Sequence, residues 1–302
     1  MQRDGLRPDE VVESAYLCQA VYEEKPYLPG WRSISMRELG LSDSYSRHLS
    51  FANHHAVAFV REQVVDGERT LAVVFQGTEM GSINDWRDNI FGINRHYEFM
   101  RPLVEAVDRY VSEHGITRVL ATGHSLGGSM AEVFMLAHPD DGTTRYLGCT
   151  FGSPGAQMPR DHEDGRIHEF VHKDDMVPVA GRCMLTRYTT PGRTIRMLRP
   201  GREEARVGVS AHRMSEYIKS LGHAMEASPL VSRWNDELSC LEEALRRGRS
   251  GDDVNLELAT GRVSHLPPPH YRKHRSAPIR DDSDTDDWMP YKVEVELTLP
   301  HF

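Results

Sequence analysis

The chain has 302 residues, and its 39% of hydrophobic residues can bury the core of one large α/β domain or two smaller ones. A formal net charge of −9 argues against a dedicated nucleic-acid-binding protein, because phosphate binding needs a concentrated basic surface. The N-terminus has no apolar core of a signal peptide, and no apolar run approaches the length of a membrane-spanning helix. We therefore expect a cytoplasmic protein, or one exported without a standard signal peptide, with no nucleic acid as partner.

The N-terminal third predicts a helix followed by a β-hairpin. Apolar residues recur at helical spacing over residues 11–22, which favours an amphipathic helix that covers one face of a sheet. Two strand-like runs follow at residues 55–60 and 70–75. Asp66-Gly67 lies between them, and this dipeptide is typical of a tight turn between antiparallel strands.

The middle of the chain alternates helices and strands. Apolar positions repeat at three and four over residues 97–114, which predicts a helix. A short apolar strand at 118–121 and a helix at 125–138 follow, and residues 145–151 and 167–171 are again strand-like. This order is typical of an open, mostly parallel α/β sheet flanked by helices.

The C-terminal part changes in character, so we divide the chain into three regions. Residues 1–225 form the α/β domain, and residues 226–250 form a helix with an apolar stripe that docks on it. Residues 251–302 form a polar, partly disordered tail. Within this tail, residues 291–299 alternate apolar and polar side chains and are compatible with a terminal strand.

The most informative motif places Ser125 between Gly123 and Gly127, directly after the apolar strand and before the amphipathic helix. A serine at such a strand-to-helix turn has a strained backbone, and side chains two residues away on either side would collide there. The pattern predicts a nucleophile elbow, and hence a serine hydrolase.

A serine nucleophile needs a histidine base and an acid, which in this fold follow it in the order acid, then histidine. Asp174 and Asp175 compete for the acid, because both lie where a strand runs into a loop and neighbouring side chains of an extended chain point to opposite faces. Several histidines follow, and His212 has the best setting, between a small-residue stretch and a helix.

An acyl-transfer site also needs N–H donors for the developing oxyanion. The N–H after the nucleophile belongs to Leu126. A second donor is expected at a strand end, where Gly77 allows the backbone of Thr78 to turn toward the site. Gly77-Thr78 is also compatible with a simple strand-ending turn.

These motifs together resemble the class 3 lipases, the fungal-lipase-like branch of the α/β-hydrolases. The resemblance spans roughly residues 10–222 and rests on V-V-F-Q-G-T at 73–78, D-W at 85–86, G-H-S-L-G-G at 123–128, F-G-S-P at 151–154, D-x-V-P at 175–178 and H-x-x-x-x-Y at 212–217. It implies Ser125 as nucleophile, Asp175 rather than Asp174 as acid, His212 as base, and Thr78 and Leu126 as oxyanion donors. Gln76 replaces the family's usual arginine, and the stretch between Asp175 and His212 is short, which implies reduced loops around the site.

The resemblance implies hydrolysis of carboxylic esters of lipids, by a lipase or phospholipase that forms an acyl-enzyme. Residues 80–96, where many relatives carry an apolar lid, have little continuous apolar surface. The alternatives are a soluble carboxylesterase, an acyltransferase of the same fold, or a non-catalytic scaffold that acts through its C-terminal tail. The expected partner is a lipid or other ester, with transient contact to a membrane surface compatible with it.

No cofactor or metal is expected. The four cysteines lack metal-ligand spacing and are interpreted as free thiols in a reducing compartment: Cys18, Cys149, Cys183 and Cys240. His265, His270 and His274 have no orderly spacing, and the acidic run at 281–287 lacks the alternating ligands of a calcium loop. Both are better interpreted as solvated parts of the tail.

Overall fold

The computed structural model describes residues 5–23, 28–77, 93–140, 142–157, 164–179, 188–189, 191–201 and 207–227. All of them lie in one compact unit, Met1–Pro267. The tail predicted at 251–302 lies outside the described residues, as does nearly all of the docking helix at 226–250. None of the helices in the described ranges has the length and apolar character needed to cross a membrane.

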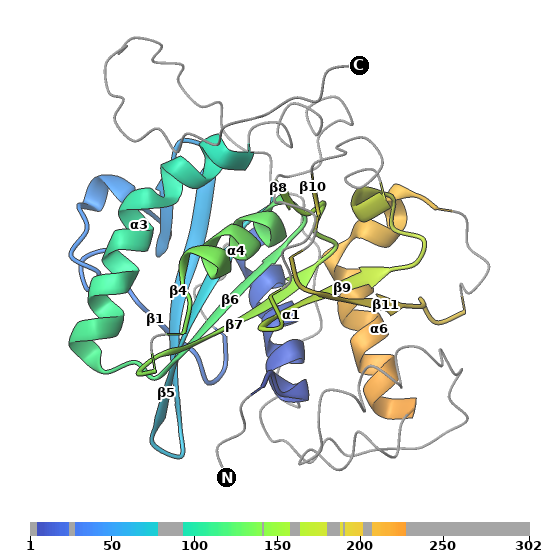
Figure 1. Ribbon diagram of the computed structural model, residues 1–302, viewed down its shortest axis with the longest axis horizontal. Coiled ribbons are helices and arrows are strands. Elements are labelled where there is room, and N and C mark those ends of the chain that lie inside the picture. Colours follow the sequence, from blue (N-terminus) through green and yellow to red (C-terminus); the bar gives the residue numbers. More distant parts are fainter. Residues whose placement is uncertain are drawn as a thin grey trace, which may run out of the picture. The chain divides into compact units, whose positions relative to one another are not determined.

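The described chain is a mixed α/β structure, as the sequence predicts (Figure 1). Its helices are α1 (Pro8–Tyr22), α3 (Ile93–His114), α4 (Leu126–Ala137) and α6 (Met214–Ala227), with 3-10 turns η1 (Asp43–Tyr45) and η2 (Val209–His212). Its strands are β1 (Arg32–Ser33), β2 (Ser46–Arg47), β3 (Ser50–Asn53), β4 (Ala56–Val65), β5 (Glu68–Phe75), β6 (Arg118–His124), β7 (Arg145–Phe151), β8 (Ala156–Gln157), β9 (Ile167–His172), β10 (Tyr188–Thr189) and β11 (Arg193–Met197).

The central sheet has nine strands in the described residues, in the order β11-β9-β7-β6-β5-β4-β3-β2, with β1 paired to β4. Strands β5, β6, β7, β9 and β11 run parallel, and the strands on the other side of β5 are antiparallel. The predicted parallel sheet therefore corresponds to one half of the observed sheet. This half contains β6 and β9, the strands that lead to the predicted site residues. Strands β8 and β10 form a separate antiparallel pair.

Helices cover both faces of the sheet because the side chains of its central strands alternate between two apolar cores. In β5, Leu71 and Val73 pack in the core with α3 and α4, and Val74 packs in the core with α1 and α6. Strand β6 divides in the same way, with Val119 on the first side and Leu120 on the second. Burial on both faces explains why these strands read as continuous apolar runs.

The hairpin forms at the predicted dipeptide. Val65 of β4 pairs with Glu68 of β5, so only Asp66 and Gly67 form the loop, and their φ angles are 51° and 83°. Positive φ at both positions is the geometry of a type I′ turn, whose twist matches that of the strands. Strand β4 continues five residues beyond the predicted end at residue 60, because its pairing with β5 extends to this turn.

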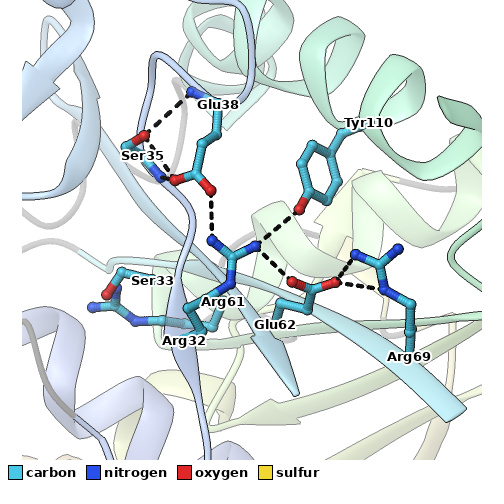
Figure 2. A network of polar contacts seen from close by, with 8 residues as sticks. All are labelled: Arg32, Ser33, Ser35, Glu38, Arg61, Glu62, Arg69 and Tyr110. Atoms are coloured by element: carbon cyan, nitrogen blue, oxygen red, sulfur yellow. Dashed lines mark hydrogen bonds and ion pairs between the residues drawn. The ribbon is translucent and has the colours of Figure 1, made fainter. Parts of the chain in front are cut away.

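A polar network fastens the antiparallel half of the sheet to α3 (Figure 2). The buried Glu62 carboxylate accepts hydrogen bonds from Arg32, at 2.7 Å, and from Arg69, at 2.8 Å. Arg32 also donates to Glu38 at 2.5 Å and to the Tyr110 hydroxyl at 3.2 Å. Burial alone would raise the pKa of Glu62, but the two arginines hold it below its ordinary value.

Helix α1 lies along β6 and contacts it at two levels. At its start, Glu10 and Arg118 form a buried pair, with nitrogen–oxygen distances of 2.8 and 2.7 Å. In the middle, Cys18 Sγ lies 3.3 Å from the hydroxyl of Thr122. Cys18 is a buried free thiol, as expected. These contacts fix where the end of α1 meets the end of β6.

Two buried carboxylates face each other across the sheet–helix boundary. Glu132 of α4 and Glu169 of β9 are both fully buried. Burial, and then the charge of Glu169, raise the pKa of Glu132 well above its ordinary value of 4.5. Between pH 4.5 and its raised pKa, Glu132 is therefore protonated in the folded protein and ionised in the unfolded chain.

This pair predicts a pH-dependent gain in stability for Glu132→Gln. Above pH 4.5 the unfolded chain loses the Glu132 proton and the folded chain keeps it, so wild-type stability falls as the pH rises toward the folded pKa. The amide has no such proton, and we expect a free energy of unfolding higher than wild type by about 1–3 kcal/mol at pH 8, with a much smaller gain at pH 5. Urea unfolding at both pH values measures this. A gain of equal size from the exposed control Glu105→Gln would contradict the explanation.

Candidate active site

Ser125 lies at a sharp turn between β6 and α4, with φ 58° and ψ −130°. Positive φ is a strained conformation for a residue other than glycine. A hydrogen bond from Ser125 N–H to the Phe151 carbonyl, 2.9 Å long, helps hold this turn. A Cβ on Gly123 would collide with the backbone of Gly127, and one on Gly127 would collide with the backbone of Phe75. The two glycines of the motif therefore sit where no side chain fits.

Asp175 and His212 meet beside this turn, although 37 positions separate them. Asp175 follows β9, and His212 ends η2. His212 Nδ1 lies 2.8 Å from Asp175 Oδ2, and the side chains are 1% and 0% exposed, so water does not compete for this hydrogen bond. The competing Asp174 points elsewhere and accepts a hydrogen bond of 2.9 Å from the buried Arg199. The structure thus brings Asp175, and not Asp174, to the histidine.

The buried carboxylate of Asp175 has a partner at each oxygen. Oδ1 accepts from the Val177 N–H at 2.9 Å, and Oδ2 accepts from the Tyr217 hydroxyl at 2.7 Å as well as from His212. Burial alone would raise the pKa of Asp175, but its electrostatic interaction with His212 and these hydrogen bonds lower it below its ordinary value. Asp175 is therefore an anion suited to hold the His212 ring in one tautomer.

The proton on His212 is assigned from its neighbours. A carboxylate only accepts, so Nδ1 carries the proton and Nε2 of the neutral ring is an acceptor. Nε2 is buried and has no hydrogen-bond partner within the described part of the chain. A Cβ on Gly152, which follows the residue that binds Ser125 N–H, would lie 3.1 Å from His212 Nδ1. Ser125, Asp175 and His212 are therefore gathered around the same short segment.

Of the two expected oxyanion donors, one belongs to a described residue. Leu126 is the first residue of α4, so its N–H has no partner within the helix. Thr78 lies outside the described residues. Gly77 comes directly before it, and a Cβ there would collide with the Tyr22 hydroxyl and lie 3.1 Å from Ser125 Cβ. The segment that leads to Thr78 therefore runs against the serine.

Residues 80–96 are the interval in which many members of the resembled family carry a lid, and most of them lie outside the described residues. The histidines and the acidic run of the tail lie outside them too. Among the residues that are described, no group of three or more His, Cys, Asp or Glu side chains could hold a metal ion.

Sequence reasoning missed several residues that contact the site. Tyr217 and Gly152 belong to motifs quoted for the family resemblance, H-x-x-x-x-Y and F-G-S-P, but received no role. Gly152 has φ 57°, and any side chain there would meet the Asp175–His212–Tyr217 cluster. Their place in these motifs was the available signal. His172 gave no signal, because its contacts join segments far apart in the chain.

Comparison with known proteins identifies one family model. The model, described as a Tle-like phospholipase domain of phospholipase-like proteins, matches residues 13–145. The match includes the turn at Ser125 and ends before Asp175 and His212. No curated protein matches the chain.

Solved structures similar to the chain include several fungal lipases. The Rhizomucor miehei lipase in its propeptide complex is 18% identical over 56% of this chain and 70% of its own, with a TM-score of 0.38. The lipase from Rhizopus microsporus var. chinensis is 15% identical over 63% and 74%, with a TM-score of 0.41. The mono- and diacylglycerol lipase from Aspergillus oryzae is 17% identical over 61% and 77%, with a TM-score of 0.40.

The central sheet flanked by helices, with a serine at a strained strand-to-helix turn, defines a protein of the α/β-hydrolase class. Together with the family model, these features support a lipase-like family. The resemblance inferred from the sequence motifs is confirmed at that level.

The crowding at Gly152 predicts a large loss of stability for Gly152→Ala. The positive φ costs an alanine about 1–2 kcal/mol, and its Cβ would lie 2.8 Å from Tyr217 Oη and 2.9 Å from Asp175 Oδ2. Gly115 is a matched control, because its φ is 61° and nothing lies within 4 Å of a Cβ there. We expect urea unfolding to show a greater loss for Gly152→Ala than for Gly115→Ala. Equal losses would contradict the crowded geometry.

Proposed function

We propose that the chain is a serine hydrolase that cleaves carboxylic esters of lipids, with phospholipids as the favoured substrates. The observation that carries the proposal is the buried Asp175–His212 hydrogen bond, which leaves His212 Nε2 as an acceptor without a partner among the described residues, with the His212 ring against that of His124, the residue before Ser125. An acceptor nitrogen on an oriented imidazole is what a serine hydroxyl needs to become a nucleophile. A purely structural histidine would be expected to use both ring nitrogens.

The mechanism that follows from this geometry has two halves. Ser125 Oγ attacks the ester carbonyl carbon while His212 Nε2 takes the hydroxyl proton, and Asp175 stabilises the imidazolium that forms. The tetrahedral intermediate then collapses, the alcohol leaves with the proton from His212, and the acyl group stays on Ser125. Water, deprotonated by His212, attacks this acyl-enzyme, and His212 returns the proton to Ser125 Oγ as the carboxylic acid leaves.

Charge on the carbonyl oxygen is stabilised in this proposal by two backbone donors. The Leu126 N–H lies at the N-terminus of α4, where the helix dipole also favours a negative charge. We assign the second donor to Thr78, because Gly77 directs the chain past Ser125. Removal of one such donor typically costs about 10²–10³ in kcat.

Two observations support a lipid substrate, and one favours phospholipids. The family model describes a phospholipase domain. Of the five large hydrophobic side chains exposed in the described residues, three flank the acid and base: Val179, Val207 and Val209. The segments that carry them lie together, because Asp175 and Gly208 form a β-bridge. Apolar side chains at the rim of a site suit an acyl chain better than a small polar ester.

A substrate panel tests the activity. We expect fatty acid release from phospholipid vesicles to exceed hydrolysis of a triglyceride emulsion and of short p-nitrophenyl esters. Ser125→Ala should reduce it by at least roughly 10³-fold, whereas the exposed Ser44→Ala should not change it. Absence of hydrolysis in the whole panel by folded protein would overturn the proposal. A preference for the soluble ester would make the protein a carboxylesterase.

Neighbouring aspartates provide a matched pair for the acid. Asp175→Asn should lower kcat by roughly 10³–10⁴-fold, because the amide no longer fixes the tautomer of His212. Asp174→Asn should keep most of the activity but lower the free energy of unfolding by about 1–3 kcal/mol, because the buried Arg199 loses its closer carboxylate and keeps only Glu216, at 3.5 Å. Kinetics and urea unfolding of both variants measure this. The reverse pattern would assign the acid to Asp174.

A further inference from the structure

Two buried histidines outside the proposed triad approach the backbone of the proposed base from two different strands. His124 ends β6, directly before Ser125, and its Nε2 lies 2.6 Å from the backbone carbonyl of His212. Its Nδ1 lies 3.0 Å from the Tyr22 hydroxyl, at the end of α1. The rings of His124 and His212 lie 4.6 Å apart between centroids, so the two side chains are in contact.

His172 makes the same kind of bridge from the other side. It ends β9, three residues before Asp175, and its Nδ1 lies 2.8 Å from the carbonyl of Ala211. Its Nε2 lies 2.9 Å from the Ser220 hydroxyl of α6. The ring also stacks on Tyr217, with centroids 4.0 Å apart. His172 is 2% exposed and His124 is 6% exposed.

The partners fix the protonation of both rings. A carbonyl can only accept, so Nε2 of His124 and Nδ1 of His172 must carry a proton. The other nitrogen of each neutral ring then accepts a hydrogen bond from a hydroxyl, that of Tyr22 for His124 and that of Ser220 for His172. Burial, as the largest cause, lowers the pKa of His124 to about 3 and also lowers the pKa of His172. Both rings are therefore neutral at physiological pH, and each bridges a hydroxyl to a carbonyl.

The two carbonyls that they bind need external partners. Ala211 and His212 are the last residues of η2, a 3-10 turn of four residues. The last carbonyls of a helix have no partner within it. The hydrogen bonds of a 3-10 turn also have poorer geometry than those of an α-helix, so the turn alone holds the position of the His212 side chain only weakly. Two successive carbonyls are thus held by one histidine from the strand of the nucleophile and one from the strand of the acid.

We infer that His124 and His172 are positioning residues that hold the 211–212 backbone, so that the His212 ring stays between Asp175 and Ser125. The inference rests on the proposed function for its catalytic consequence. Each acts through a backbone carbonyl, His124 through that of His212 and His172 through that of Ala211, and the His124 ring also packs against the His212 ring. A displacement of the base by about 1 Å can cost roughly 10²-fold in rate, so this support matters more to kcat than to substrate binding.

The two sites differ in which nitrogen donates, and this gives a crossed test. A glutamine amide nitrogen can take the place of Nε2, and an asparagine amide nitrogen can take the place of Nδ1. At position 124, we therefore expect His124→Asn to lower kcat by roughly ten- to hundredfold, and His124→Gln to recover most of it. At position 172 the order reverses, so His172→Gln is the damaging change and His172→Asn is the one that recovers activity. KM should stay nearly constant in all four variants.

His138 is a matched control, because its Nδ1 also lies 2.6 Å from a backbone carbonyl, that of Phe134, at the far end of α4. His138→Asn and His138→Gln should both leave kcat unchanged. If the two amides at position 124, or at position 172, are equivalent, the inference is wrong even when Ser125→Ala abolishes hydrolysis. Urea unfolding of each variant separates lost kcat from lost stability, and a loss of stability alone would also overturn the inference.

A second measurement does not depend on activity. Long-range nitrogen–proton NMR of the full chain, labelled with ¹⁵N-histidine, reports which ring nitrogen carries the proton. We expect His124 as the Nε2–H tautomer, neutral from pH 5 to pH 9, and His172 as the Nδ1–H tautomer, neutral from pH 7 to pH 9. The opposite tautomer, or a charged ring, at either position would overturn the inference. If the tautomers are as expected but the protein hydrolyses no ester, the proposed function fails and the assigned contacts stand.

Discussion

The buried negative charge of Asp175 is the constraint on which the rest of the site depends. A carboxylate without access to water is tolerated only when its oxygens are fully paired, and removal of a partner from such a charge typically costs about 3–5 kcal/mol. Asp175 takes its partners from its own loop, from η2 and from α6. These three segments therefore meet at the Asp175 carboxylate. The need to satisfy one charge and the need to orient the His212 ring are met by the same contacts.

The proposed nucleophile, Ser125, is positioned by a second constraint, the register between α1 and β6. From Glu10 to Tyr22 the helix rises roughly 18 Å, and from Arg118 to His124 the strand spans roughly 20 Å. The two elements therefore match in length, with the Glu10–Arg118 pair at one end and the Tyr22–His124 contact at the other. Because Ser125 follows His124, this register also fixes where the strained turn lies. Any change that shifts α1 along the sheet would move both the turn and the support of His212.

Local signals in the sequence predicted the elements of the fold that depend on local chemistry. Asp66-Gly67 indicated a two-residue hairpin turn, and the apolar strand before the Gly-x-Ser-x-Gly motif indicated β6 and α4. The choice between Asp174 and Asp175 could not come from the backbone alternation alone. It depends on Arg199, which binds Asp174 from a segment 25 residues further along the chain. The roles of His124 and His172 were hidden for the same reason, since their partners are distant in sequence. Thr78 and the docking helix remain predictions.

The proposed mechanism requires Ser125 to be the one nucleophile, activated by His212 and Asp175. The most direct measurement is to inactivate the full-length protein with a fluorophosphonate and to map the adduct by tandem mass spectrometry. We expect a single adduct on Ser125, formed in wild type and absent when the protein is first unfolded in urea. An adduct on another serine, or no adduct on folded wild-type protein, would contradict it.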